Sequence, residues 1–207
     1  IAAYDLTAPG VPLAAHLDSL LSWKADRIPE YILLLSTSTL TTVTDYRDPA
    51  LAALMGDGAY AMVVSPQRAS HAKVIHAEYE SDLALKSSAS IDIYGYIKIN
   101  LPEFEQLTVQ KTITMIDSLS SHYSLNFERD RYIAQQFSRS LLGKILSDLR
   151  IPKSSSLENV TRRGYMAGSS AGTVLAENWR NIRAGEKLVS TMVGFGSSWG
   201  NIVVEGV

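Results

Sequence analysis

The chain has 207 residues, of which 46% are apolar and 19% are charged, and its formal net charge is −2 at pH 7. Such a composition is ordinary for a packed protein, and this charge excludes a whole-protein field that would gather nucleic acid or anionic membrane. The sequence has no Cys, which excludes disulfides, thiolate metal ligands and a Cys nucleophile. Its apolar runs are far shorter than the ~20 residues of a transmembrane helix, and no basic segment precedes an apolar run at its start. A cytoplasmic location is therefore expected.

The first predicted element is a strand over residues 1–6, followed by a tight turn that ends at Gly10. A helix is predicted over 12–24, because Pro stands at its first position and Leu residues recur at helical spacing. Two continuous apolar runs, at 31–35 and 59–64, are typical of strands that are buried on both faces.

The second part of the chain follows a cluster of turn-forming residues at 65–70, which predicts an internal boundary. A strand is predicted over 73–79, and helices and strands then alternate. The helices are predicted over 107–123, 135–149 and 171–183, and the strands over 131–134, 187–193 and 201–205. This alternation predicts an α/β fold with a largely parallel core sheet, which the closing pair of strands makes mixed.

Three glycine-containing segments give the sequence its most informative pattern: Gly56-Asp57-Gly58-Ala59-Tyr60-Ala61, the run at 165–172, and the run at 194–200. Their order and separations resemble the later three-fifths or so of a ketoacyl-ACP synthase III of the thiolase superfamily. The resemblance includes the opening strand at 3–6. Short segments at both ends are also similar to the non-catalytic subunit of the heterodimeric alkylquinolone synthase.

The resemblance implies a thiolase-like layered fold with mixed, largely parallel core sheets. Residues 1–66 would form the end of the N-terminal half, and residues 67–207 would form the C-terminal half. The first part of the N-terminal half would then be absent from this chain. Three origins remain open: a processed product, a subunit encoded apart from its N-terminal piece, and an incomplete sequence.

The resemblance also aligns three positions with the side chains that perform condensation in the family. Gly10 takes the place of the acylated Cys at a helix N-terminus, and Ala134 takes the place of the His that polarises the incoming thioester carbonyl. Gly168 takes the place of an Asn in a neighbouring loop. The resemblance thus implies that none of the three catalytic side chains is intact.

Other residues could bind substrate at these positions. Ser169 and Gln135 carry groups that could bind a carbonyl, although a Ser nucleophile also needs a positioned base. The resemblance assigns an oxyanion-binding backbone N–H to Gly196. No recurring ligand spacing predicts a metal. Neither the run at 194–200 nor Gly56-Asp57-Gly58 opens a helix as a nucleotide-binding loop does, so no cofactor is expected. The His residues lie away from the three aligned positions in the sequence: His16, His71, His76 and His122.

A local basic surface is the remaining candidate for recognition. Arg139 matches an Arg that docks the acidic carrier protein in the family, and Lys144 follows on the same predicted helix. The alternative interpretation is a solvated helix face, because acidic residues are interleaved with the basic ones.

These observations favour a non-catalytic subunit that acts beside a competent condensing enzyme in polyketide or fatty-acid-derived metabolism. An acyltransferase or hydrolase with a non-standard site, or with residues from a partner chain, is the first alternative, and an acyl-ligand binding module is the second. The expected partners are a homologous synthase subunit or a detached N-terminal half, with acyl carrier protein or acyl-CoA as further candidates.

The apolar strand at 31–35 is expected to pair with a partner chain and make an obligate dimer, since an open apolar edge would template aggregation. Replacing Leu34 by Lys should then disrupt the assembly. The alternative is a central strand of a monomer, paired on both sides.

Overall fold

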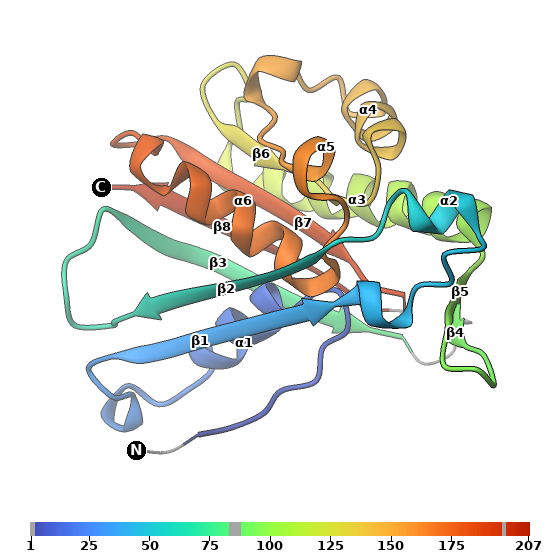
Figure 1. Cartoon of the computed structure of the whole chain (residues 1–207). Coiled ribbons are helices and arrows are strands. Elements are labelled where there is room, and N and C mark those ends of the chain that lie inside the picture. Colours follow the sequence, from blue (N-terminus) through green and yellow to red (C-terminus); the bar gives the residue numbers. More distant parts are fainter. Residues whose placement is uncertain (1–2, 83–87, 196–197) are drawn as a thin grey trace.

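The structure is a computed structural model that describes residues 3–82, 88–195 and 198–207 (Figure 1). Its larger sheet has four strands in the order β3-β8-β7-β6, and β1 and β2 form a separate antiparallel pair, as do β4 and β5. The strands are β1 (Ile32–Thr39), β2 (Asp57–Val64), β3 (Ala72–Ser81), β4 (Ala89–Ile91), β5 (Ile97–Ile99), β6 (Arg131–Ile133), β7 (Lys187–Val193) and β8 (Ser198–Gly206).

The helices arrange these sheets in layers (Figure 1). α1 and α6 lie between the β1–β2 pair and the four-stranded sheet, whereas α3 and α4 cover the opposite face of the four-stranded sheet. The α-helices are α1 (Pro12–Leu21), α2 (Pro49–Ala52), α3 (Leu101–Tyr123), α4 (Arg139–Asp148), α5 (Val160–Arg163) and α6 (Ser170–Asn178). Short 3-10 turns are η1 (Ala25–Arg27), η2 (Leu40–Val43), η3 (Lys153–Ser155), η4 (Ala167–Ser169) and η5 (Trp179–Asn181).

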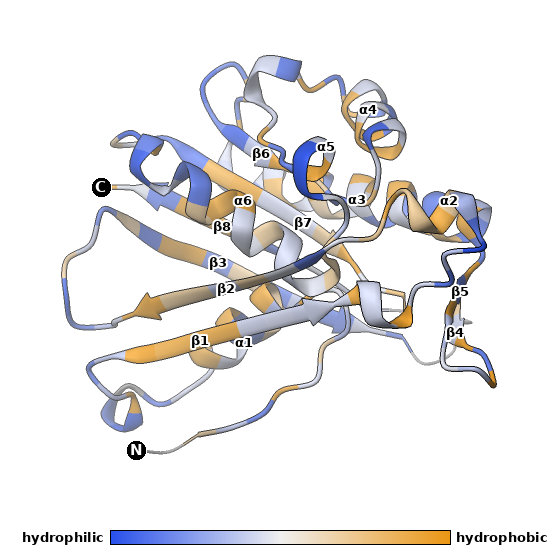
Figure 2. Ribbon diagram, viewed as in Figure 1, coloured by the Kyte–Doolittle hydropathy of each residue, from blue (hydrophilic) through white to orange (hydrophobic). Residues whose placement is uncertain are grey.

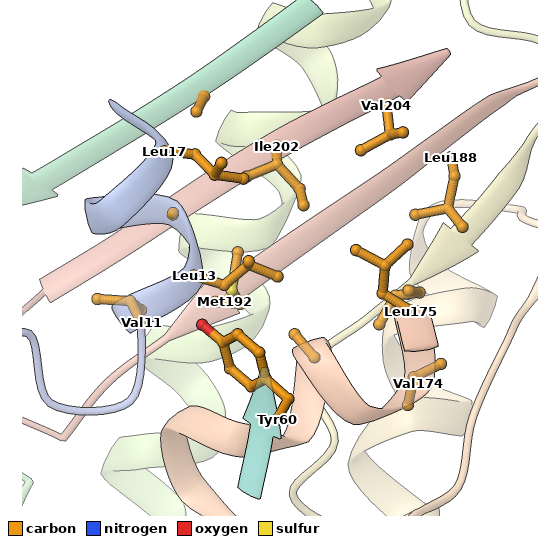
Figure 3. Close-up of a cluster of buried hydrophobic side chains, with 14 of the residues drawn as sticks. Val11, Leu13, Leu17, Tyr60, Val174, Leu175, Leu188, Met192, Ile202 and Val204 are labelled. Atoms are coloured by element: carbon orange, nitrogen blue, oxygen red, sulfur yellow. The ribbon is translucent and has the colours of Figure 1, made fainter. Parts of the chain in front are cut away.

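Two apolar cores hold the layers together. The first joins α1 and α6 to the inner faces of both sheets, with Leu13, Tyr60 and Ile202 among its buried members (Figure 3). The second joins α3 and α4 to the other face of the four-stranded sheet, around Phe104 and Leu141. Because each core is apolar on both contacting surfaces, burial of these side chains fixes the order of the layers.

The mixed α/β fold is confirmed, but the expectation of largely parallel sheets is corrected. In the part of the chain that the structure describes, only β6 and β7 pair as parallel strands of a sheet. β7 and β8 are joined by a short connection, which forces them to run antiparallel, and β3 adds antiparallel to the far edge of β8. Alternation along the sequence does not reveal which strands become neighbours.

The predicted opening strand is not formed: residues 3–6 have no regular structure. A strand needs a neighbour for its backbone groups, and none is paired with this segment among the described residues.

α4 begins at Arg139 and not at 135, because the Ser138 hydroxyl caps it by accepting from the Leu141 N–H at 3.1 Å. α3 begins six residues earlier than predicted, where the Asn100 side chain caps it.

The strand at 31–35 was expected to be buried on both faces, and this is wrong for the described chain. In β1, Leu34 faces the inner core and is 7% exposed, whereas Leu33 and Leu35 face outward and are each 58% exposed.

None of the helices in the described residues is long and apolar enough to cross a membrane.

Candidate functional site

The turn before α1 places Gly10 against the end of β7. The Val11 N–H donates to the Ala8 carbonyl at 3.0 Å, and Gly10 has φ 82°, a left-handed conformation that favours glycine. A Cβ on Gly10 would stand 2.6 Å from the Cα of Gly194, which follows β7. Two backbone segments thus touch at the position where the resemblance places a nucleophile, and no side chain fits between them without a shift.

Gly168 lies at the same end of α1. It belongs to η4, and a Cβ on it would meet the Cδ and Cγ atoms of Pro12 at 2.6 Å. Pro12, the first residue of α1, therefore packs closely against η4, the loop in which the resemblance places an Asn. Because the Pro ring is rigid, a larger side chain at 168 requires movement of the helix or the loop.

Ala134 follows β6 and is 1% exposed. Its neighbour Gln135 is buried and bridges to β7, where its amide donates to the Val193 carbonyl at 3.0 Å and accepts from the Val193 N–H at 3.3 Å. Because Val193 precedes Gly194, which contacts Gly10, Gln135 connects the segment that carries Ala134 to the end of β7 beside Gly10. Both ends of the Gln135 amide are bonded to backbone, so Gln135 fixes the position of β7.

Four aromatic rings fill the space beside this site. Phe195 lies 4.8 Å from Phe104 and 5.7 Å from Tyr165 between ring centroids, and Phe137 lies 4.9 Å from Phe104 and 5.0 Å from Tyr165. Phe137 and Tyr165 are 1% and 0% exposed. The edge-to-face and tilted arrangements make this a packed aromatic cluster next to the aligned positions.

Ser169 lies in η4, directly after Gly168. Its Oγ is buried, donates to the Ser36 carbonyl at 3.3 Å, and lies 3.3 Å from the Ser38 Oγ. Hydroxyls and carbonyls do not act as general bases at neutral pH, and burial raises the pKa of the nearby Tyr60 and Tyr165 phenols, which keeps them neutral. Among these contacts Ser169 therefore has no group that would activate it as a nucleophile.

His71, His76 and His122 contact residues outside the three aligned positions. His71 packs on Trp179, His76 on Tyr123, and His122 Nδ1 lies 2.9 Å from the Ser118 carbonyl oxygen. Burial lowers the pKa of His16, which is on α1. The described residues hold no group of three or more His, Asp or Glu side chains that could bind a metal ion.

The candidate recognition residues are separated on α4. Arg139 is the exposed first residue of the helix and has no ion pair within the described chain. Lys144 is also exposed and lies 3.6 Å from Asp148, one turn later. Five positions on an α-helix correspond to about 140° of rotation, so Arg139 and Lys144 point to different sides of α4. Gly196 lies outside the described residues.

A polar cleft of about 600 Å³ opens beside α5 and α6. Arg162 and Arg163 both donate to Glu177, at 2.9 and 2.7 Å. Partial burial opposes ionisation of Glu177, but Arg163, Asn159 and Arg162 together outweigh it and hold the pKa of Glu177 below its ordinary value. Arg162, Arg163 and Glu177 are therefore paired with one another, whereas the Glu158 carboxylate accepts from the Thr161 hydroxyl. Its lining is Ser156, Leu157, Glu158, Arg162, Arg163, Glu177 and Asn178.

Sequence reasoning missed the contacts that close the site. Gly194 and Pro12 were both visible as parts of motifs, but their contacts with Gly10 and Gly168 are made between segments distant in the chain. The aromatic cluster has no local signature either. Two of its members stand in the glycine-containing runs, Tyr165 at 165–172 and Phe195 at 194–200, but nothing in those runs indicates that the rings meet.

Two family models match the chain. Residues 24–83 match 3-oxoacyl-[acyl-carrier-protein (ACP)] synthase III, and residues 126–205 match the C-terminal model of the same synthase. The beta-ketoacyl-[acyl-carrier-protein] synthase III of Streptococcus equi subsp. equi is 22% identical over 191 residues, covering 84% of this chain and 58% of that protein. The Vesicomyosocius okutanii synthase III is 22% identical over 182 residues, with 84% and 57% covered.

Solved structures show the same fold. The 3-oxoacyl-[acyl-carrier-protein] synthase III of Aquifex aeolicus matches with a TM-score of 0.88 at 21% identity, covering 99% of this chain and 67% of that one. A tetronic acid condensing enzyme matches with a TM-score of 0.84 at 14% identity, covering 97% and 68%. Fold and matching models together define a thiolase-type condensing-enzyme scaffold. The chain belongs to the ketoacyl synthase III-like proteins of the thiolase superfamily, and it spans 58% of the length of its Streptococcus relative.

Proposed function

We propose that this chain is a non-catalytic ketoacyl synthase III-like subunit that acts beside a competent condensing enzyme in polyketide or fatty-acid-derived metabolism. The observation that carries the proposal is the closed site at the N-terminus of α1. The aligned positions carry Gly10, Ala134 and Gly168, which offer neither a nucleophile nor a side-chain donor. The contacts of Gly10 with Gly194 and of Gly168 with Pro12 occupy the space that such side chains need.

The magnitude of the loss supports the same conclusion. Removing one oxyanion-stabilising donor typically costs ~10²–10³ in rate, and without a nucleophile the covalent route is lost altogether. The part of the scaffold that this chain spans is retained, because it keeps the fold of the Aquifex synthase III over 67% of that structure. A chain that keeps the scaffold without the reacting groups fits a role in stabilising a homologous subunit or shaping its acyl site.

Intact-mass spectrometry after exposure to acyl-CoA tests this proposal. The purified chain is expected to keep its mass, because covalent acyl transfer requires an activated nucleophile. The contacts of Ser169 are a carbonyl and hydroxyls, and none of them would activate it as a base does. A synthase III homologue with its Cys intact serves as the positive control and should gain one acyl group. An acyl adduct on this chain at one defined residue would contradict the proposal and favour the acyltransferase alternative.

We further propose that Arg139 retains a carrier-docking role. Arg139 is exposed and lacks an intramolecular ion pair among the described residues, so its charge remains available to an acidic partner. Arg139→Glu should weaken binding of an acyl carrier protein roughly 1.5- to fivefold at low salt, the scale of exposed ion pairs. The wild-type interaction should also fade with added salt, because the screening length is ~10 Å at 0.1 M.

Fluorescence anisotropy with a labelled carrier protein gives the affinities. Lys73→Glu is the matched control, because it makes the same charge change at an exposed position on β3. Equal weakening by both variants would reduce the effect to net charge, and unchanged affinity in Arg139→Glu would return Arg139 to the solvated-face interpretation.

A further inference from the structure

Phe195 is the outermost ring of the aromatic cluster beside the aligned positions. The other three rings are buried, with Phe104 and Tyr165 each 0% exposed and Phe137 1% exposed. Phe195 is partly exposed and lies 4.8 Å from Phe104 and 5.7 Å from Tyr165 between ring centroids. Its centroid stands 6.3 Å from that of Phe137. Phe195 therefore packs against all three buried rings, and of the four it is the one that reaches solvent.

Three of the rings belong to the same segments as the aligned positions. Phe137 follows Ala134 by three residues, and Tyr165 precedes Gly168 by three. Phe195 directly follows the glycine that contacts the turn before α1. Aromatic side chains from these segments thus fill one apolar space, which belongs to the core around α3 and α4.

The backbone that carries Phe195 is held by hydrogen bonds and close packing. The Phe195 carbonyl accepts from the Ser88 N–H at 3.2 Å, and the Gly194 N–H donates to the Ser198 carbonyl at 2.8 Å. Gly194 also lies so close to Pro9 that a Cβ on it would overlap the Pro9 carbonyl oxygen. Because these contacts fix the backbone, the Phe195 ring leaves the cluster by rotation of its side chain or by breaking them.

We propose that Phe195 is a built-in plug, whose ring occupies an apolar ligand site and keeps acyl chains and small aromatic ligands out of the wild-type chain. The other three rings form walls of this site, and apolar walls bind hydrocarbon by burial. A ligand would have to displace the Phe195 ring and would break its contacts with all three. The inference rests on packing, goes beyond the proposed role beside a condensing enzyme, and holds whether or not the chain catalyses a reaction.

The polar cleft beside α5 and α6 does not suit such ligands. Arg162 and Arg163 form ion pairs with Glu177 in its lining, and Figure 2 shows strongly hydrophilic colouring on α5. A hydrocarbon group placed there would take these charged groups out of water without offering them a hydrogen bond. An apolar ligand is therefore expected to bind where Phe195 now stands.

Phe195→Ala tests the inference, because it removes the phenyl ring and leaves a void beside the other rings. Voids lined by apolar side chains stay free of water and bind ligands of benzene size. Isothermal titration calorimetry measures binding of toluene, as a ring probe, and of octanoate, as an acyl probe, to the purified chain. We expect Phe195→Ala to bind both probes at least about tenfold more tightly than the wild type, the scale of burying one apolar group.

Phe127→Ala is the matched control. Phe127 is also partly exposed and packs against the same core, but its ring lies beside Tyr132, 5.7 Å away between centroids. The substitution makes the same chemical change away from the aligned positions. Phe127→Ala should therefore bind neither probe more tightly than the wild type does.

Circular dichroism shows whether each variant is folded, and Phe195→Leu carries the same prediction if Phe195→Ala unfolds. Binding of either probe by the wild type as tightly as by the Phe195 variant would overturn the inference, as would a folded Phe195 variant that binds neither probe. Equal tightening in Phe127→Ala would reduce the effect to a loosened core and overturn it too. These results leave the mass-spectrometric test of catalysis unaffected, because non-covalent binding needs no nucleophile.

Discussion

Gly10→Cys is expected to lower the free energy of unfolding by about 2–6 kcal/mol and to leave the chain without a working nucleophile. Two costs add at this position. Gly10 has φ 82°, which strains any residue with a Cβ, and that Cβ would stand 2.6 Å from the Cα of Gly194. Because the obstructing atom belongs to backbone, relief requires the turn before α1 or the end of β7 to move.

Urea unfolding of Gly10→Cys and Gly143→Cys measures the effect. Gly143 lies within α4, and a Cβ there meets nothing within 4 Å, so Gly143→Cys makes the same chemical change in open space. This control should stay close to wild-type stability or exceed it, since Gly costs roughly 0.5–1 kcal/mol in a helix interior. Equal stability of the two variants would show that the turn at Gly10 accommodates a side chain.

Leu34→Lys is expected to unfold the chain or to lower its free energy of unfolding by about 4 kcal/mol or more. Leu34 is 7% exposed and belongs to the core around α1 and α6. The substitution removes a buried apolar side chain and places an ammonium group within a cluster of buried apolar residues. Because Leu34 points inward, Leu34→Lys tests the core and does not test the assembly expected for the strand at 31–35.

Leu33→Lys is the matched control, one residue away on the opposite face. Leu33 is 58% exposed, so Leu33→Lys should change stability by less than about 0.5 kcal/mol, as is usual for surface sites. It should also reduce self-association of the chain purified alone. Circular dichroism with thermal unfolding, followed by size-exclusion chromatography with light scattering, measures both effects. Similar destabilisation by the two variants would contradict the assignment of inner and outer faces.

Local patterns predicted the elements whose boundaries depend on local chemistry. The limits of β7 agree with the predicted strand over 187–193, and α1 begins at the predicted Pro12, because continuous apolar runs and a first-turn Pro are read from neighbouring residues. The early start of α3 was missed for the opposite reason. Its cap is the Asn100 side chain, which accepts a hydrogen bond from the Glu103 N–H, and the apolar spacing of the helix becomes clear only later.

Contacts between segments distant in the sequence determine the burial of β1 and the shape of the candidate site, which local patterns do not predict. Apolar residues on both sides of β1 predicted burial on both faces, and the pattern does not say whether the covering layer belongs to the same chain. The three aligned positions were found from motif order, yet the approach of Gly10 to Gly194 and of Gly168 to Pro12 depends on packing between layers. Motif order therefore located the candidate site, and tertiary packing determined its shape.

The most direct measurement of the central claim is condensation of acyl and malonyl thioesters by the purified chain. Product formation should stay at the level of a no-protein control, because Gly10, Ala134 and Gly168 supply neither the nucleophile nor the donors that the reaction needs. An intact synthase III assayed in parallel shows that the substrates are competent. Turnover by this chain, free of any partner and above the no-protein rate, would contradict the account.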